Sequence, residues 1–500
     1  MMTKLKICLI ASAGAFTLAS SAQAGTLYMA TLNGANENPP TTATFTGTGF
    51  LVLNDAETQG VVTATHNINI TLTGGHIHRG PAGVNGPIIF PFADPNSPVG
   101  PLTWAIPAAD LVNLKTAGLY MNFHTTVNPG GAIRGQLLRV LLAPSAADAS
   151  QTAVANALDV SAGYTNDLDN VLKGLAVSST TVRAQALGEL SGATIYAQGR
   201  QAMETMRQAQ DDMFRQAEML AKNPEDTTGG FVAVGDTFGK RDTVAGQAGS
   251  KISRPSVLVG LHKTFGAGAT AGFAVGYADG KDKFRGGLGR TQVKTTSAQM
   301  FVSGGSDPLV FTGTLGYGWS KVDTSRNLSA IGRNASSSHD AKVWAVGAKV
   351  SAPLAAGGST TISPYARVDL QHASIDAYAE AGAGSAGLVV PKRKDKNAAV
   401  ELGASLDIPM SEGDTAIGGY LQAGWRHMLE EGDDAFATAF SGSPVSFQSQ
   451  VLSQGKDAAH ISAGVNAKLG ENLTGSAGYT GVLSKRTSDH SVQLKLTLKM

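Results

Sequence analysis

The feature that most constrains this chain is an alternation of apolar and polar side chains, with a period of two, that recurs through its last half. It is clearest in the last ten residues, whose apolar members are Val492, Leu494, Leu496, Leu498 and Met500. This period predicts a strand with one apolar and one polar face. Similar segments recur between residues 230 and 499, joined by turn-rich sequence and without helices to cover their apolar faces. We therefore expect lipid to cover them.

Strands exposed to lipid must close on themselves, because an open edge would leave backbone groups without partners. We count about twelve strands in residues 226–500 and predict a closed transmembrane β-barrel with a polar lumen. The residues expected to face the lumen are Arg367, Asp369, Gln371, Gln422 and Arg426. They either contact a helix inside the pore, through charges such as Asp211 and Arg215, or line a water-filled channel.

Residues 181–225 are predicted to supply that helix, after a partly helical linker at residues 144–180. From Arg200 onward, apolar residues recur near helical spacing with charged residues between them. Gly188 and Gly192 weaken the first part of the helix, and Pro224 ends it. Twenty-odd residues at about 1.5 Å each span about 30 Å, comparable to the apolar band of about 25 Å in such barrels.

The first 24 residues have the pattern of a secretory signal peptide. Lys4 and Lys6 precede an apolar run, and small residues before Ala24 predict cleavage between Ala24 and Gly25. The one cysteine, Cys8, lies in this segment, so we expect a mature chain without disulfides. No later run of 18 apolar residues predicts a spanning helix. The net charge of +1 gives no reason to expect a nucleic-acid partner.

Residues 25–143 predict a small antiparallel β-sandwich-like domain, so the fold class of the whole chain is mainly β. Gly, Pro and Asn separate short β segments in this region. The predicted strands are residues 26–31, 44–53, 61–72, 88–92, 119–123 and 133–142.

Three histidines in this domain form a candidate metal site. His76 and His78 are two residues apart, so both project to the same side of a strand, and His124 could be a third ligand. A structural role is the alternative, in which the imidazoles hydrogen-bond to loop carbonyls under the Gly- and Pro-rich turns. A divalent metal is thus one candidate cofactor, and no other cofactor is predicted.

Arg134 and Glu37 are a second candidate pair, because a guanidinium matches a carboxylate in a two-pronged contact. Arg134 with Glu37 either clamps a substrate or pins the N-terminal loop to the last strand, and we expect the second role. The mature chain has no cysteine and no Gly-x-Ser-x-Gly nucleophile elbow. We therefore predict that it is not an enzyme.

Three motifs stand out in residues 25–143, namely residues 37–40, 75–87 and 120–136, the last of which ends in Ile-Arg-Gly-Gln. Together they resemble the CHRD domain, a module of secreted proteins. The resemblance covers nearly all of this region and implies a β fold without an established chemistry. Ala132 stands where the family usually has an acidic residue, so any role of that carboxylate is absent.

A second set of motifs lies within the predicted barrel, at residues 363–372, 377–382, 402–403, 425–427, 439–442 and 479–481. With these motifs, residues 150–500 resemble the autotransporter β-domain, the translocator of type V secretion. The resemblance implies a barrel in the outer membrane of a Gram-negative bacterium. It also implies outer-membrane lipid, the inner-membrane secretion machinery and the barrel-assembly machinery as partners. Met500 departs from the terminal Phe or Trp of such barrels, which bears on assembly efficiency.

The resemblances together imply that residues 25–143 are a passenger, displayed at the cell surface to bind or adhere to an unknown ligand. Two other functions fit the same segments. The passenger could be a surface metal-binding domain or metalloenzyme that uses the three histidines. Alternatively, the domain could stay in the periplasm beneath a porin-like channel.

Overall fold

The computed structural model describes residues 25–221, 226–244, 247–265, 269–306, 308–411, 416–431, 435–450 and 455–500. The whole expected signal peptide, residues 1–24 with Cys8 and Ala24, lies outside the described residues. The described residues form two compact units, one of residues 25–140 with 160–164 and the other of residues 141–159 with 165–500. None of the described helices is long and apolar enough to cross a membrane. The mainly β fold class is confirmed.

The first unit is a nine-stranded antiparallel sheet with the order β5-β4-β7-β8-β1-β2-β3-β6, in which β9 also pairs with β1. Its strands are β1 (Thr26–Asn33), β2 (Thr46–Leu53), β3 (Gln59–His66), β4 (Leu72–Arg79), β5 (Ile88–Pro91), β6 (Val99–Ala105), β7 (Leu119–Thr125), β8 (Ile133–Gln136) and β9 (Leu138–Arg139). One face carries the core, which includes Leu32, Leu51, Ile77, Met121 and Ile133, all fully buried. The other face is therefore free to carry polar side chains.

Several elements of the first unit differ from the predicted strands. The predicted strand 61–72 ends at His66, because the side chains of His66 and Asn67 accept backbone N–H groups and interrupt the ladder after β3. The strand β4, which begins at Leu72, was not predicted. The strand β6 and the helix α1 (Ala108–Lys115) were not predicted. Pro101 hides the strand pattern of β6, but β6 is an edge strand, where proline is tolerated.

Helices lead from the sheet to the second unit. They are α2 (Ala149–Leu158), α3 (Asn166–Val177), α4 (Thr180–Leu190) and α5 (Ala197–Ala221). Asp148, Thr165 and Ser179 cap the first three, each accepting a backbone N–H of the first turn. The helix predicted at residues 181–225 is not continuous but forms two helices, α4 and α5, because Gly192, with φ +71°, turns the chain between them. Its predicted end, residues 222–225, lies outside the described residues.

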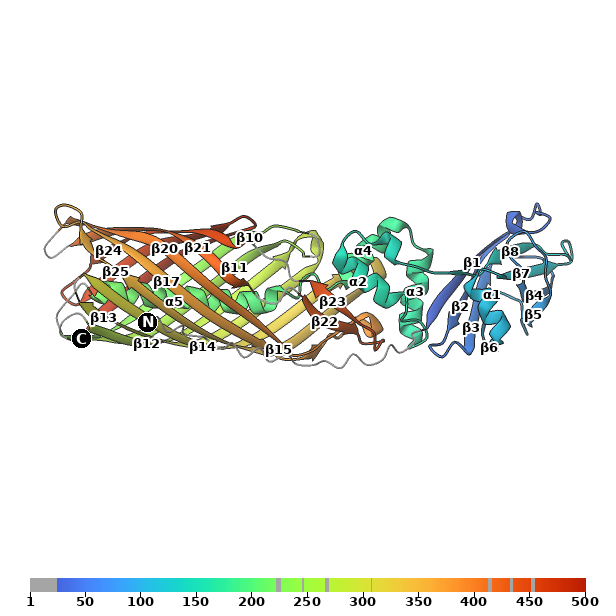
Figure 1. Ribbon diagram of the computed structural model, residues 1–500, viewed down its shortest axis with the longest axis horizontal. Helices are drawn as coiled ribbons and strands as arrows, with labels where there is room; N and C mark the ends of the chain where they lie inside the picture. Colours follow the sequence, from blue (N-terminus) through green and yellow to red (C-terminus); the bar gives the residue numbers. More distant parts are fainter. Residues whose placement is uncertain are drawn as a thin grey trace, which may run out of the picture. The chain divides into compact units, whose positions relative to one another are not determined.

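The second unit is a closed antiparallel barrel around α5 (Figure 1). Twelve long strands follow one another in chain order, and the sheet closes where β10 pairs with β26. The strands are β10 (Thr227–Arg241), β11 (Ser250–Phe265), β12 (Ala269–Phe284), β13 (Gly289–Ser306), β14 (Leu309–Leu328), β15 (Arg333–Ser351), β17 (Thr361–Ile375), β20 (Arg393–Ser411), β21 (Ile417–Glu431), β24 (Asp457–Lys468), β25 (Leu473–Ser484) and β26 (Thr487–Lys499). The predicted strand number is confirmed.

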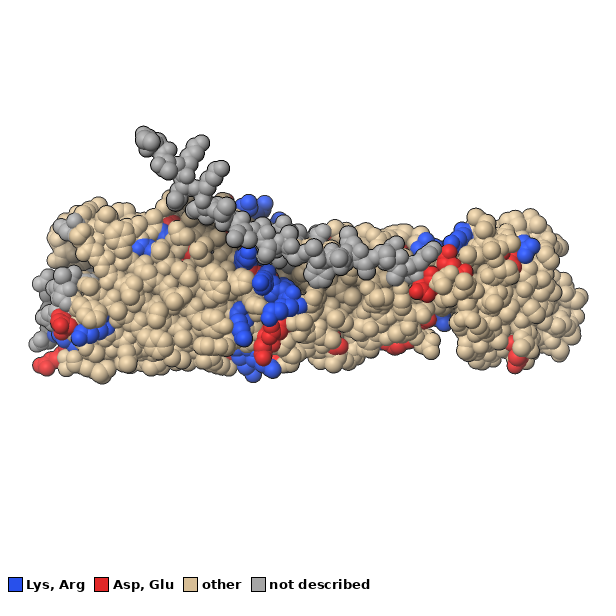
Figure 2. Space-filling view, turned by 60° about the horizontal axis from the view of Figure 1, so that its bottom comes forward, with Lys and Arg blue, Asp and Glu red and all other residues tan. Residues whose placement is uncertain are grey.

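The alternation seen in the sequence sorts side chains between the two faces of the barrel. On β26 the apolar set faces outward, and the side chain of Leu494 is 62% exposed. Trp319, Trp344 and Trp425 lie on the same outer surface. Figure 2 shows a band of basic side chains next to a wide uncharged surface. Exposed lysines near the end of the strands where β10 finishes include Lys240, Lys251, Lys281, Lys294, Lys321 and Lys342. An apolar band bordered by aromatic and basic residues is the surface that a bilayer requires.

The two ends of the barrel differ in the length of their connections. At the end where β10 begins and β26 finishes, the connection between β24 and β25 is a short turn of residues 469–472. At the opposite end, residues 376–392 and 432–456 connect successive barrel strands. These connections contain a separate four-stranded sheet of β18 (Tyr378–Ala379), β19 (Leu388–Val390), β22 (Ala435–Phe440) and β23 (Ser446–Gln450). The predicted strand 445–451 belongs to this sheet rather than to the barrel wall, and Val451 lies outside the described residues.

Candidate functional site

The helix α5 fills the barrel lumen, and one of its sides packs on the strands β12–β15. Met203 and Met206 form an apolar cluster with Val293, Val322 and Val343. Glycines on the wall let the helix approach closely. A Cβ at Gly318 would lie 2.8 Å from the Met206 sulfur, and one at Gly347 would lie 2.9 Å from the ring of Phe214. The small residues of these strands therefore shape the wall around the helix.

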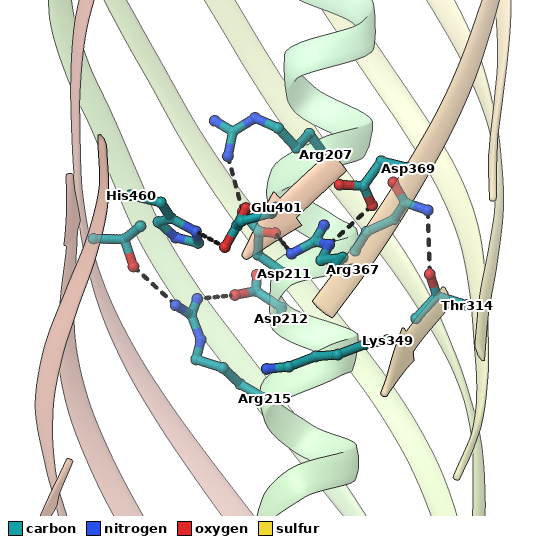
Figure 3. A network of polar contacts seen from close by, with 12 residues as sticks. Arg207, Asp211, Asp212, Arg215, Thr314, Lys349, Arg367, Asp369, Glu401 and His460 are labelled. Carbon is teal, nitrogen blue, oxygen red and sulfur yellow. Dashed lines mark hydrogen bonds and ion pairs between the residues drawn. The ribbon is translucent and has the colours of Figure 1, made fainter. Parts of the chain in front are cut away.

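The charged side of α5 meets the opposite wall in a network of ion pairs (Figure 3). Asp211 accepts from Arg367 of β17 at 2.6 Å and from Arg207 at 2.9 Å. Arg367 also contacts Asp369 at 2.9 Å, and Asp369 contacts Arg426 of β21 at 2.6 Å. All five side chains are largely buried, so each charge depends on its partners rather than on water.

The residues predicted to face the lumen do so, but they differ in what they contact. Gln371 donates to the backbone oxygen of Met203 on α5 at 2.9 Å. Gln422 instead donates to the Tyr365 hydroxyl at 2.9 Å and lines a cavity of about 70 Å³ beside α5. Arg215 extends along this cavity, bonded to Asp212 and Thr480. The polar cavity is large enough for water, so the lumen holds both a contacting helix and a hydrated remainder.

A second charged cluster, nearer the long connections, was not predicted. Glu204 of α5 accepts from Arg241 at 2.6 Å and from Arg254 at 2.7 Å, and Arg241 also pairs with Asp282. Arg241 and Arg254 alternate with outward-facing residues on β10 and β11. The lumen-side position of these two arginines could have indicated the cluster from the sequence, because a charged side chain on the lumen side of such a strand requires a partner.

The helices α3 and α4 contact the connections at the same end of the barrel. Asp167 forms a two-pronged pair with Arg333, at 2.6 and 2.9 Å, and accepts the Ser385 N–H at 2.7 Å. These bonds lower the pKa of Asp167 to about 2. Glu189 of α4 accepts the Ala330 N–H at 2.9 Å, and Arg326 donates to the Glu189 carbonyl at 2.6 Å. The segment before α5 is thus folded against the barrel rather than a free linker.

In the first unit, the structure brings His76, His78 and His124 together on the polar face of the sheet. In the register of β4 and β7, Gly74 lies opposite His124 and His76 lies opposite Asn122. One nitrogen of each imidazole lies within 4.8 Å of the other two. Burial, followed by the neighbouring His124 and His78, lowers the pKa of His76 to about 4. The neutral form of imidazole, which this shift favours for His76, is the form that binds metals.

Arg134 holds the loop of residues 80–87 over this face. Its guanidinium lies 3.4 Å from the centre of the Tyr120 ring and donates to the Pro81 and Val84 carbonyls at 2.9 and 3.0 Å. Tyr120 stacks in turn on His78, with ring centres 4.9 Å apart. Arg134 therefore positions both the loop and the ring beneath it.

The two-pronged pair predicted between Arg134 and Glu37 is not formed among the described residues. Glu37 accepts a long hydrogen bond from Asn122 at 3.4 Å, and its other oxygen is buried without a partner. Burial raises the pKa of Glu37 to about 7, although nearby Arg134 acts in the opposite direction. The pairing failed because loop carbonyls, which spacing in the sequence does not reveal, take the donors of Arg134.

A closed barrel of twelve two-faced strands, with a helix paired to its inner wall, is an outer-membrane barrel that encloses part of its own chain. The chain belongs to the autotransporter family, since residues 230–480 match the model of the autotransporter beta-domain. Residues 28–137 match the CHRD domain. The barrel is therefore a type V secretion translocator of the Gram-negative outer membrane.

Two relatives from Serratia marcescens, each called an extracellular serine protease, are also similar. One is 26% identical over 259 residues, covering 50% of this chain and 24% of its own length. The other is 25% identical over 187 residues, covering 36% of this chain and 17% of its own length. The chain thus spans at most about a quarter of the length of these relatives.

Solved structures similar to this chain include two other autotransporter domains. The translocator domain of NalP from Neisseria meningitidis is 15% identical, with a TM-score of 0.48, and the match covers 59% of this chain and 98% of that one. The beta domain of the Bordetella autotransporter Brka is 17% identical, with a TM-score of 0.42, covering 55% and 99% of the two chains.

Proposed function

We propose that this translocator carries the CHRD domain across the outer membrane and keeps it displayed at the cell surface. The observation that carries the proposal is the direction of α5 in the lumen. Its last turn packs near Phe231 at the start of β10, and its first residue packs near Phe284 at the end of β12. The chain before α5 therefore leaves the pore at the end with the long connections, which in such barrels is the extracellular end.

The contacts of α2, α3 and α4 support retention at this end. The helix α2 packs against β23, and Ser449 of β23 donates to the Ser191 carbonyl at 2.8 Å. The ion pair between Asp167 and Arg333 lies in the same region. Once formed outside, these contacts favour the exported state and oppose sliding of the chain back through the pore. These contacts thereby favour export of the CHRD domain without nucleotide hydrolysis.

Protease treatment of intact cells tests the display. The CHRD domain should be lost from intact cells, while the barrel and a periplasmic marker survive. If the domain is cut only after the outer membrane is broken, the alternative of a periplasmic domain beneath a channel is correct. A chain that lacks residues 25–143 provides the control, because its barrel should resist the protease equally.

We propose further that the displayed domain acts in binding or adhesion, because the barrel already accounts for anchoring and export. Cells that carry the full chain should retain a surface ligand that cells with the chain lacking residues 25–143 do not retain. Equal adherence of both cell types to host and abiotic surfaces, at matched barrel levels, would contradict this role.

A further inference from the structure

We propose that His76, His78 and His124 form a binding site for a divalent transition-metal ion that prefers imidazole nitrogen, such as copper or zinc. This goes beyond display of the domain, because it assigns the domain a ligand. The arrangement of lone pairs carries the inference. A metal ligand must present an unprotonated nitrogen, and the hydrogen bonds around two of the rings determine which nitrogen that is.

The proton positions of His78 and His124 follow from their hydrogen bonds. The Nδ1 of His78 lies 3.0 Å from the Gly86 carbonyl, and the Nδ1 of His124 lies 3.0 Å from the Pro129 carbonyl. A carbonyl only accepts, so each Nδ1 carries the proton, and in the neutral ring each Nε2 carries a lone pair. A second nitrogen that donates to a backbone carbonyl is the usual support of a metal-binding histidine, since it fixes both tautomer and ring orientation.

The nitrogens left over are the ones a metal would use. The Nε2 atoms of His78 and His124 and the Nδ1 of His76 are all buried without a hydrogen-bond partner. Buried polar atoms normally have partners, so three such atoms on adjacent rings call for an explanation. A purely structural role explains the hydrogen bonds of the Nδ1 atoms of His78 and His124, but it does not explain why the other three nitrogens lack a partner.

The size of the cluster suits a first-row ion. A point central to three atoms no more than 4.8 Å apart lies within roughly 2.8 Å of each, against about 2.0–2.1 Å in zinc–histidine sites. Small side-chain rotations close that difference. Three histidines leave a fourth coordination position for water or a ligand. His78 is buried, but His76 and His124 are only partly buried, which leaves a route for the ion.

The surrounding residues keep this geometry. Gly74 has no side chain, and a Cβ there would lie 2.7 Å from the ring of His76. Gly86, whose carbonyl holds His78, donates its N–H to the Tyr120 hydroxyl at 3.1 Å. Arg134 fixes the same loop from the other side. The site is therefore built by the sheet and by the loop of residues 80–87 together.

The test uses the full-length protein, purified in detergent with an affinity tag free of histidine, stripped with a chelator and then titrated with Zn²⁺ or Cu²⁺ alone. We expect about one ion per chain, with affinity reduced at least roughly 100-fold in His76→Gln, His78→Gln and His124→Gln. His66→Gln is the matched control. Both of its ring nitrogens already have partners, the Pro95 carbonyl and the Ile68 N–H, so binding should not change.

A second measurement needs no variant and so does not depend on whether the variants fold. The electron paramagnetic resonance spectrum of the Cu²⁺-loaded wild-type protein should show coupling to imidazole nitrogens. Failure to bind either ion stoichiometrically, binding that the three substitutions leave unchanged, or a copper spectrum without nitrogen coupling would each overturn the proposal. The metal measurements use purified protein, so they do not depend on whether the CHRD domain is displayed at the cell surface.

Discussion

At the scale of single residues, the lumen shows how a buried charge is tolerated. Asp211 on α5 has two arginine partners, and Arg367 links it to Asp369 on the wall. Fully breaking a buried pair costs about 3–5 kcal/mol, and removing Arg367 should cost up to that amount, because among the described residues Asp211 keeps only Arg207 and Asp369 keeps only Arg426 as partners. These pairs therefore connect the helix to the barrel.

We expect Arg367→Met to destabilise the folded barrel by an amount in that range. The temperature at which the barrel loses its folded gel mobility should fall. The double variant Asp211→Asn/Arg367→Met should recover only part of the loss, because it removes both charges of that pair but takes the Asp211 partner from Arg207. Arg290→Met, at an exposed position of β13, is the control and should have little effect. A variant Arg367→Met as stable as the control would contradict the role of the network.

Glu37 shows the opposite case, a buried carboxyl without an ionic partner within bonding distance. Its pKa is raised from 4.5 to about 7, so the folded domain holds this proton more tightly than the unfolded chain does. The associated stability is complete below about pH 4.5 and is lost as the pH rises through 7.

Glu37→Gln cannot ionise, so it should unfold at a higher temperature than the wild type at pH 8 and show no such gain at pH 5. The difference at pH 8 should be on the order of 1–3 kcal/mol. Calorimetry of the full-length protein at both pH values measures it. Asp94→Asn, on the surface of the same domain, is the control, and a gain independent of pH would contradict the burial of a charge.

At the scale of elements, the barrel strands were predictable and several other elements were not. Lipid on one side and polar lumen on the other impose the same alternation on every strand, as on β26. The strand β6 lies on an edge and contains Pro101, so it lacks that pattern. The interruption between α4 and α5 depends on one residue, Gly192, whose positive φ the sequence allows but does not require. The periodicity of a sequence shows on which face of an element a side chain lies, whereas the residue at which the element ends depends on the local backbone geometry.

The partners of the site residues were harder to predict than their positions. Spacing placed His76 and His78 on one side of a strand, and the register of β4 with β7 adds His124. Arg134 was expected to reach Glu37, but loop carbonyls close in space and distant in sequence receive its hydrogen bonds. Alternation determines the face of a side chain, whereas its partner depends on strand register and loop conformation.

The final strand allows a prediction about assembly rather than stability. Met500 faces outward, 67% exposed, and its N–H bonds to the Thr228 carbonyl at 2.8 Å. Met500→Phe should change the stability of the folded barrel by less than about 1 kcal/mol, since both side chains are large and apolar. It should increase the fraction of newly made chain that reaches the folded form. Pulse labelling with gel mobility measures that fraction, and Met500→Leu is the control. An equal folded fraction for Met500→Phe and Met500→Leu would contradict a role for an aromatic residue at this position.

At the scale of the whole molecule, sequence and structure agree on an N-terminal β domain and a barrel with a helix inside it. Gly- and Pro-rich short segments predicted the first, and two-faced strands predicted the second. The contacts of α2, α3 and α4 with the long connections were not predictable, because pairs such as Asp167 with Arg333 join residues far apart in the chain. Those contacts make display, rather than free release, the expected outcome.

The most direct test of surface display uses single cysteines, because Cys8 is the only cysteine of the chain. Ala109→Cys lies at an exposed position of the CHRD domain, and Gly470→Cys lies in a short turn at the opposite end of the barrel from the long connections. A membrane-impermeant maleimide should label Ala109→Cys on intact cells, and Gly470→Cys only after the outer membrane is opened. Labelling in the reverse order, or of neither position before opening, would contradict display of the domain at the cell surface.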